Sequence, residues 1–266
     1  MKTDFDGTVQ WSKKYGGTNN EEAYSITPTF DGGFVMAGST TTFTGPPLNG
    51  PSNVYLIKVN DSGDLQWSQS ISVSAHDVAF SVKETFDHGF ILTGATDGFS
   101  TATSELFLVK TDSSGITEWI RSFETIGYSH GKGQNVIQTR DSGFAVVGYE
   151  SGIGDTSIYL ITTTSTGLIL NTLKYTIITN QNLLQTYGYD IIQNNSGNLI
   201  ITGAVGGFYG GLFFTYSPFL LETDSSGIYV ASRYYSLNSG DCRSYSVKQT
   251  NDGGYIIGGV MGIIIR

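Results

Sequence analysis

The stretch Asp31-Gly-Gly-Phe-Val-Met-Ala-Gly38 decides the fold, because it recurs along the whole chain. Its counterparts begin at Asp87, Asp141, Ser196 and Asp252, at spacings of 56, 54, 55 and 56 residues. Asp-Gly-Gly is a turn sequence, since Gly accepts positive φ, and the apolar run after it favours a strand. One unit of about 55 residues therefore fills the 266-residue chain five times.

Each unit holds four short apolar segments bounded by Gly, Asp, Ser or Asn. In the first unit these are residues 23–26, 34–38 and 54–58 and the segment around Trp67. Their length and their β-branched and aromatic content predict strands rather than helices. Four antiparallel strands at this period are typical of a propeller blade. We therefore predict an all-β fold, a five-bladed β-propeller with four antiparallel strands per blade.

The two ends of the chain complement each other. Residues 2–7 match residues 110–115, so the chain begins at the turn before a fourth strand, whereas the last repeat ends on a third strand. We predict that the N-terminal strand closes the last blade, which removes an open sheet edge. The alternative is a five-repeat part of a longer array. The predicted single propeller, residues 1–266, has blades at about 20–71, 76–124, 131–177, 186–236, and 242–266 plus 4–15.

Composition excludes several classes of protein. The net charge is −9, and no run of basic residues exceeds Lys13-Lys14, so no nucleic-acid partner is expected. No apolar stretch reaches the ~18 residues of a membrane-spanning segment, so no membrane insertion is expected. Cys242 is the only cysteine, which excludes a disulfide scaffold. The first residues lack the apolar core of a signal peptide.

Three sequence elements resemble a large family of bacterial and archaeal propeller-repeat proteins. The elements are Asp-Gly-Gly followed by Phe or Tyr, Tyr-Leu-Ile-Lys-x-Asp-x-x-Gly, and Gln-Trp-Ser-Lys-x-Tyr-Gly-Gly, the last seen at residues 10–17. The resemblance covers the whole chain and is weak in the fourth copy, where Trp, Asp and Lys are replaced. It implies the propeller fold and an extracellular or cell-surface location. It supplies no catalytic residues, because its motifs are turns and packing positions.

The connections between the second and third strands, and between the fourth strand and the next blade, vary in length. Both kinds are expected on one face of the ring, and variable loops on a rigid scaffold are the usual place for binding. A polar column, Asn20, His76, His130, Gln185 and Asp241, is expected at the mouth of the channel on this face. The candidate binding residues are Phe43, His76, Phe99, Tyr128, His130, Tyr149, Phe208, Tyr209, Tyr216 and Asp241.

The first strand of each blade carries a second polar column, Ser25, Ser81, Asn135, Asp190 and Ser246. We favour structural hydrogen bonds between neighbouring blades for this column, and the alternative is a site around Asp190. No nucleophile elbow, zinc-ligand pair, phosphate loop or calcium loop is present, so neither a metal nor another cofactor is expected.

These observations predict a non-enzymatic protein-interaction or structural module that is extracellular or surface-displayed and binds a protein or neighbouring domains through the variable face. A carbohydrate-binding, lectin-like propeller with a glycan partner is the alternative. A glycoside hydrolase centred on Asp190 is the third hypothesis, disfavoured because paired carboxylates at hydrolase spacing are not evident.

Overall fold

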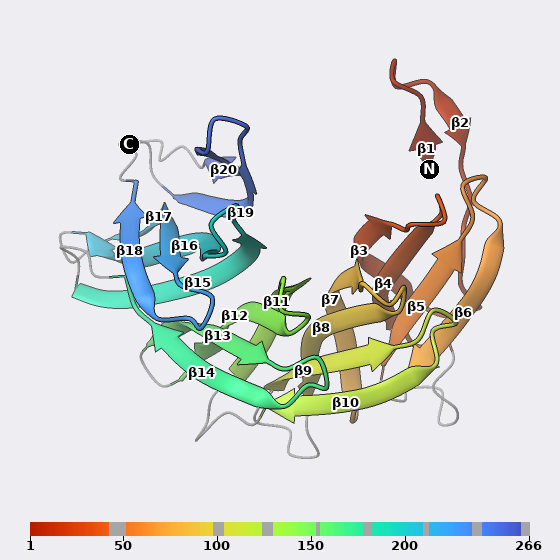
Figure 1. Ribbon diagram of the computed structural model, residues 1–266, viewed down its shortest axis with the longest axis horizontal. Coiled ribbons are helices and arrows are strands. Elements are labelled where there is room, and N and C mark those ends of the chain that lie inside the picture. Colours follow the sequence, from red (N-terminus) through yellow and green to blue (C-terminus); the bar gives the residue numbers. More distant parts are fainter. Residues whose placement is uncertain are drawn as a thin grey trace. The chain divides into compact units, whose positions relative to one another are not determined.

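The computed structural model describes residues 1–42, 52–97, 104–123, 130–152, 155–177, 182–209, 213–235 and 241–261, with the main chain alone at 182–184, 208–209 and 213–214. Throughout these ranges the regular elements are β-strands, joined mainly as antiparallel neighbours, which confirms the all-β prediction (Figure 1). None of the described residues forms a helix able to cross a membrane. The chain divides into two compact units, Met1–Thr101 with Glu105–Phe123, and Ala102–Ser104 with Glu124–Arg266.

Unit 1 contains a hairpin and two four-stranded antiparallel sheets. The hairpin pairs β1 (Lys2–Thr3) with β2 (Val9–Trp11). The first sheet has the order β3 (Glu21–Pro28), β4 (Phe34–Thr40), β5 (Asn53–Val59) and β6 (Leu65–Ile71). The second has the order β7 (His76–Glu84), β8 (Phe90–Asp97), β9 (Ser104–Thr111) and β10 (Thr117–Phe123).

Unit 2 continues the pattern. One meander comprises β11 (His130–Gln138), β12 (Phe144–Ser151), β13 (Thr156–Thr163) and β14 (Ile169–Tyr175). The next comprises β15 (Asn182–Gln193), β16 (Leu199–Tyr209), β17 (Phe213–Thr223) and β18 (Tyr229–Tyr234), and a single parallel bridge from Thr156 to Gln185 links it to the previous meander. The last sheet pairs β19 (Cys242–Gln249) with β20 (Tyr255–Met261).

Each of the first four repeats thus forms one four-stranded meander. The N-terminal hairpin has the turn geometry of a third-to-fourth connection: Asp4 N donates to Thr8 O at 2.9 Å, as Asp112 N donates to Ile116 O at 2.9 Å. In the described sheets β2 pairs with β1 alone, and residues 262–266 lie outside the described part. The closing strand predicted for the last blade is therefore not seen as a paired strand.

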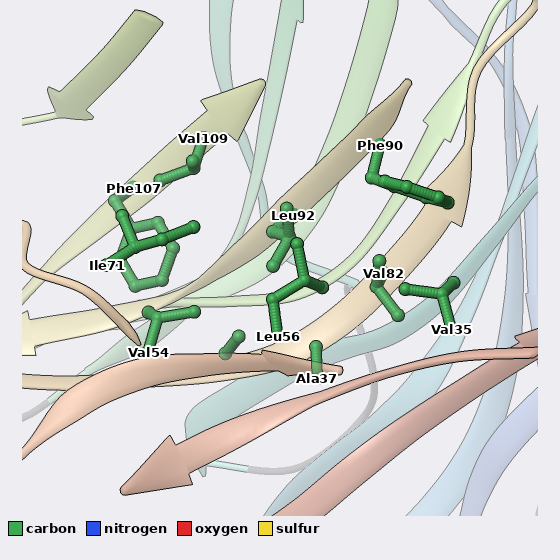
Figure 2. Packing of buried hydrophobic residues seen from close by; sticks show 11 residues of the cluster. Val35, Ala37, Val54, Leu56, Ile71, Val82, Phe90, Leu92, Phe107 and Val109 are labelled. Carbon is green, nitrogen blue, oxygen red and sulfur yellow. The ribbon is translucent and has the colours of Figure 1, made fainter. Parts of the chain in front are cut away.

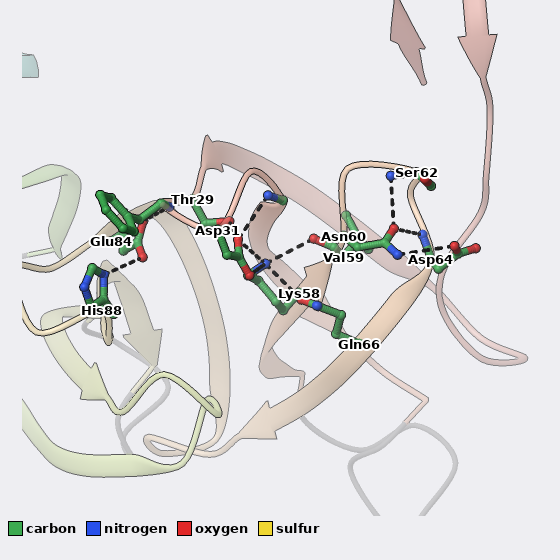
Figure 3. A network of polar contacts seen from close by, with 12 residues as sticks. Thr29, Asp31, Lys58, Val59, Asn60, Ser62, Asp64, Gln66, Glu84 and His88 are labelled. Atoms are coloured by element: carbon green, nitrogen blue, oxygen red, sulfur yellow. Dashed lines mark hydrogen bonds and ion pairs between the residues drawn. The ribbon is translucent and has the colours of Figure 1, made fainter.

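In four of the five repeats an aspartate builds the turn after the first strand. Asp31 Oδ1 accepts hydrogen bonds from Gly33 N at 3.0 Å and from Thr29 Oγ1 at 2.6 Å. Lys58, only 4% exposed, places Nζ 2.9 Å from Asp31 Oδ2 and 2.9 Å from Gln66 Oε1 (Figure 3). This buried cation therefore ties the first turn to the third and fourth strands.

Each unit has its own hydrophobic core. In unit 1, β4, β5, β7, β8 and β9 bury alternate residues against one another, as Figure 2 shows for Val35, Leu56, Leu92 and Phe107. In unit 2, Val147, Leu160, Ile201, Phe219 and Leu221 belong to an equivalent cluster. Alternate burial along a strand follows from its two-residue period. The remaining residues of each strand can therefore face a neighbouring sheet or solvent.

Every first strand contains a β-bulge at the same repeat position. The register shifts between Ala23 and Ser25, and likewise in the four other first strands. The residues left over are Tyr24, Phe80, Gln134, Tyr189 and Tyr245. The bulge brings the first strand so close that a Cβ on Gly38 would lie 1.8 Å from Glu22 O. This close approach explains why the stretch that begins at Asp31 ends in Gly at position 38.

The fourth strand of one sheet packs on the turn between the third and fourth strands of the next sheet. In unit 1 the Trp67 ring covers Gly115, where a Cβ would meet the ring at 2.6 Å. The N-terminal segment makes the same kind of contact, because Trp11 covers Gly63 and donates from Nε1 to Asp61 O at 3.0 Å. Tyr15 OH donates to Gly63 O at 2.7 Å, and Tyr175 OH donates to Gly227 O in unit 2. The N-terminal segment therefore contacts the first sheet as a fourth strand does.

Candidate functional site

Tyrosine side chains from the two meanders and from the β19–β20 sheet meet in unit 2. Along β15, Gln185, Tyr187 and Tyr189 are half-buried, whereas the residues between them are buried. The alternation of a strand places these three side chains on one face. Tyr149 on β12 and Tyr216 on β17 join them from the two sides. We call Tyr149, Gln185, Tyr187, Tyr189, Tyr216, Asp241, Arg243 and Tyr245 the tyrosine cluster.

The rings form a continuous set of contacts. Tyr187 lies 4.8 Å from Tyr149 and 5.9 Å from Tyr216 between ring centroids, and both pairs are edge-to-face. Tyr187 and Tyr189 are parallel, with an interplanar angle of 9° and centroids 6.1 Å apart. Tyr189 lies 5.1 Å from Tyr245, which is 46% exposed. The cluster therefore presents aromatic faces and edges to solvent from a preformed arrangement.

One amide fixes the position of two phenol groups. Gln185 Oε1 accepts hydrogen bonds from Tyr187 OH and from Tyr216 OH, each at 3.0 Å. Gly206 lies between Gln185 and Tyr216 in the register of β15, β16 and β17. Because directly paired residues share a face, the missing side chain at Gly206 leaves room for this contact.

Arg243 is held from two sides. Its guanidinium carbon lies 4.1 Å from the centre of the Tyr216 ring, a cation–π distance. Its Nη2 donates to Asp241 Oδ2 at 3.1 Å. Burial lowers the pKa of Arg243, but the hydrogen bonds to Asp241 outweigh it and the pKa is raised overall. Arg243 therefore remains a fixed cation beside the tyrosine rings.

Three hydroxyls of the cluster, those of Tyr149, Tyr189 and Tyr216, remain protonated at neutral pH. Burial raises the pKa of Tyr189 to about 12, although the Arg243 charge opposes the shift. Burial also raises the pKa of Tyr216, and the nearby Tyr187 hydroxyl adds to the effect. Burial raises the pKa of Tyr149 as well. The cluster thus offers neutral hydroxyl groups, each able to donate and accept hydrogen bonds.

Three of the residues predicted from sequence, Tyr149, Tyr216 and Asp241, belong to this cluster. His130 begins β11 in the same unit and is exposed, whereas His76 begins β7 in unit 1. Phe208 and Tyr209 end β16, with only their main chain described. Phe43, Phe99 and Tyr128 lie outside the described residues.

The sequence interpretation did not select Tyr187, Tyr189, Arg243 or Tyr245 as site residues. They occupy the first strands, where repeated apolar patterns indicated packing. Gln185 and Asp241 were placed in one polar column, and the positions two and four residues later hold Tyr187 and Tyr189, and Arg243 and Tyr245. Reading that column forward with the strand period would have found the cluster.

Asp190 is buried and accepts hydrogen bonds from three neighbouring groups. It is 6% exposed, and Oδ2 accepts from Val247 N at 2.8 Å while Oδ1 accepts from Ile191 N at 2.9 Å and from Asn135 Nδ2. Its carboxylate therefore joins the two meanders of unit 2 and the β19–β20 sheet, as expected for the structural hydrogen bonds favoured from the sequence. In unit 1 Ser25 Oγ similarly accepts from Val82 N at 3.2 Å. Among the described residues, no group of three His, Cys, Asp or Glu side chains is placed to hold a metal.

Comparisons with known proteins identify the type of fold. No protein-family model matches the chain, and neither does any curated protein sequence. An α-L-arabinanase from Penicillium chrysogenum, solved with arabinobiose, is similar with a TM-score of 0.58 and 7% identity, over 80% of this chain and 66% of that one. The α-L-arabinofuranosidase Arb93A from Fusarium graminearum gives a TM-score of 0.57 and 9% identity, over 88% and 68% of the two chains. The periplasmic gluconolactonase PpgL from Pseudomonas aeruginosa gives 0.52 and 11%, over 96% and 69%.

These structures have propeller-type folds, so the propeller-like architecture is shown, whereas the repeat family inferred from the motifs is not. This chain spans about two thirds of the length of the arabinanase. The comparison contradicts the prediction of a non-enzymatic interaction or structural module, because these three similar proteins are described as enzymes. The chain has a propeller-type fold shared with enzymes of carbohydrate chemistry.

Proposed function

We propose that this protein is a carbohydrate-active enzyme and that its sugar substrate binds on the tyrosine cluster. The observation that carries the proposal is the contact network of Tyr149, Tyr187, Tyr189 and Tyr216 around the Gln185 amide. Such a surface combines apolar ring faces with fixed polar groups, which is the usual composition of a small-molecule site.

The chemistry of the cluster suits a sugar ring. Aromatic side chains with polar tips offer an apolar face together with a hydrogen-bonding end. A sugar has apolar C–H faces and a rim of hydroxyl groups, so it can use both. The phenol groups of Tyr149 and Tyr189, which stay protonated at neutral pH, donate or accept as the sugar requires. Because Gln185 already orients two of them, less ordering is needed on binding.

The similar structures support the same class of ligand. They are described as an arabinanase, an arabinofuranosidase and a gluconolactonase, and the arabinanase contains arabinobiose. In the described part of the cluster Asp241 is the one carboxylate, and we propose it as a general base. Glycoside hydrolysis usually needs a second carboxylate, so the proposed reaction is limited to an acid–base step on a sugar substrate.

The test is calorimetric titration with arabino-, galacto- and galacturono-oligosaccharides, combined with turnover assays on the same sugars. Tyr189→Ala removes the central ring and should weaken binding at least tenfold. Tyr229→Ala removes an exposed tyrosine from β18 of the same unit and should leave binding unchanged. Asp241→Asn should abolish turnover while retaining most binding. Absence of binding to all three sugar classes, or equal loss in the Tyr189 and Tyr229 variants, would contradict the proposal.

We also propose that the fold is a closed ring of five blades, with the N-terminal hairpin as the outer part of the last one. Support comes from Trp11 and Tyr15, which contact the first sheet as Trp67 and Tyr175 contact theirs. Deleting residues 1–16 should lower stability and promote self-association through the exposed edge. A truncated monomer as stable as the full chain would contradict closure.

The extracellular or cell-surface location and the membership in the propeller-repeat family remain predictions from the sequence motifs. Fractionation of the source cells, with surface proteolysis of the intact cells, would test the location. Protein found only inside the cells would contradict it.

A further inference from the structure

The tyrosine cluster is bordered by a second cation, Lys132. Lys132 lies on β11 directly opposite Tyr149 on β12. Directly paired residues of an antiparallel ladder project from the same face of the sheet. Tyr149 in turn contacts both Tyr187 and Tyr189, at 4.8 Å and 6.4 Å between ring centroids. Lys132 therefore lies on the face that carries the cluster.

Lys132 is half-buried, yet it forms no ion pair with any carboxylate in the described part of the chain. Lys58 and Lys110, the buried lysines of unit 1, are each paired with carboxylates instead. The Lys132 ammonium group therefore has no carboxylate of the described chain to balance its charge, so it can pair with an anionic group of a ligand.

Arg243 provides a cation at the other side of the rings. Asp241 balances its charge, so Lys132, Arg243 and Asp241 together leave one net positive charge on this face. The chain as a whole has a net charge of −9, so the charge of this face is opposite in sign to that of the whole protein. A local positive field in an acidic protein favours an anion at that place.

We propose that the sugar bound by the tyrosine cluster carries carboxylate groups, as an oligosaccharide of uronic acid does, and that Lys132 and Arg243 bind those carboxylates. This inference rests on the proposed carbohydrate function and adds the class of sugar. The tyrosine rings would contact the sugar rings, and the two cations at their sides would each contact a carboxylate. Arg243, fixed by Asp241 and Tyr216, is preorganised for this contact.

Two probes isolate the carboxylate. Trigalacturonate and the corresponding galactose trisaccharide share ring configuration and linkage, and differ in carrying a carboxylate or a hydroxymethyl group. Titration of the full chain at 50 mM and 300 mM NaCl should show trigalacturonate binding at least tenfold more tightly at low salt. The difference should shrink at high salt, because ionic strength screens exposed charges.

Three substitutions assign the effect. Lys132→Gln should weaken trigalacturonate binding about tenfold and leave the neutral sugar unchanged, and Lys132→Arg should restore most of the affinity. Lys248→Gln removes the same charge from an exposed position on β19 and should have little effect. Melting curves of each variant show that folding is retained.

Equal affinity for the two trisaccharides, or equal effects of the Lys132 and Lys248 variants, would overturn the uronate inference while leaving the carbohydrate proposal intact. Failure of both trisaccharides and of every neutral sugar to bind would overturn both proposals together. Charge-dependent binding that Tyr189→Ala does not weaken would also overturn the inference, because the anion would then bind elsewhere.

Discussion

Substitution of Gly203 by alanine should disturb the tyrosine cluster through the backbone alone. Gly203 on β16 pairs with Gly188 on β15, beside the bulge. A Cβ at Gly203 would lie 1.7 Å from Tyr187 O, whereas ordinary contacts begin at 3.4 Å. The difference, 3.4 − 1.7 = 1.7 Å, is the distance by which the two strands must separate or tilt.

The magnitude follows from this overlap. Overpacking in a well-packed region costs about 1–3 kcal/mol, and the atom met here is backbone, so we expect about 3 kcal/mol. For a chain of this size that corresponds to a fall in melting temperature of roughly 6–12 °C. Tyr187 moves with its carbonyl group, so sugar affinity should fall more than tenfold in the protein that remains folded.

Two further alanine variants serve as controls, with thermal unfolding and calorimetric titration as the assays. Gly258→Ala places a Cβ with nothing within 4 Å and should behave as the unmodified protein. Gly94→Ala meets Val78 O at 1.9 Å in unit 1, so it should lower the melting temperature but spare sugar binding. If Gly203→Ala melts and binds as the unmodified protein does, the argument from close approach is wrong.

Three further substitutions test other contacts. Asp190→Ala leaves the buried Val247 N–H without its acceptor and should destabilise the fold by about 2 kcal/mol in urea unfolding, whereas a neutral effect would show that Asp190 is not an interblade contact. Hydrogen bonding by Lys58 lowers the pKa of Asp31 to about 2. Because the pKa in the unfolded chain is about 3.9, the Lys58–Asp31 pair contributes its full stabilisation above that pH. This contribution is lost as the pH falls towards 2. Lys58→Met should therefore reduce melting temperature at pH 7 more than at pH 2, and an equal reduction at both pH values would contradict this account. Trp67→Ala uncovers Gly115 and should cost about 3 kcal/mol, a prediction that fails if chemical unfolding is unchanged.

The strands and turns are predictable from the sequence because the same turn and strand patterns recur in each repeat. Asp31, Asp87 and Asp141 mark turns that the structure forms with the same hydrogen bond to the second Gly or its equivalent. The polar column containing Asp190 was correctly favoured as interblade hydrogen bonding. Local chemistry is sufficient in these cases because a turn or a cap involves residues close in sequence.

The site was only partly predictable. Tyr149 and Tyr216 stood out because they were assigned to variable loops, whereas the structure places them within β12 and β17. Tyr187 and Tyr189 did not, because aromatic residues within a strand are also what a core requires. Their exposure depends on the bulge in β15 and on the neighbouring sheets, and a single repeat sequence contains neither. The prediction of a non-enzymatic module was wrong for a related reason, because it relied on the absence of recognised catalytic motifs.

The shared bulge also bears on how the proposed ligand contacts could change during evolution. A bulged residue makes no pair across the ladder, so its side chain can change without disturbing strand register. The five positions hold Tyr, Phe, Gln, Tyr and Tyr, a range of side chains that the neighbouring Gly position does not show. Each repeat therefore has one position open to mutation beside a glycine that must be kept. Duplication of such a repeat copies both, so new ligand contacts can evolve at one residue while the scaffold stays the same.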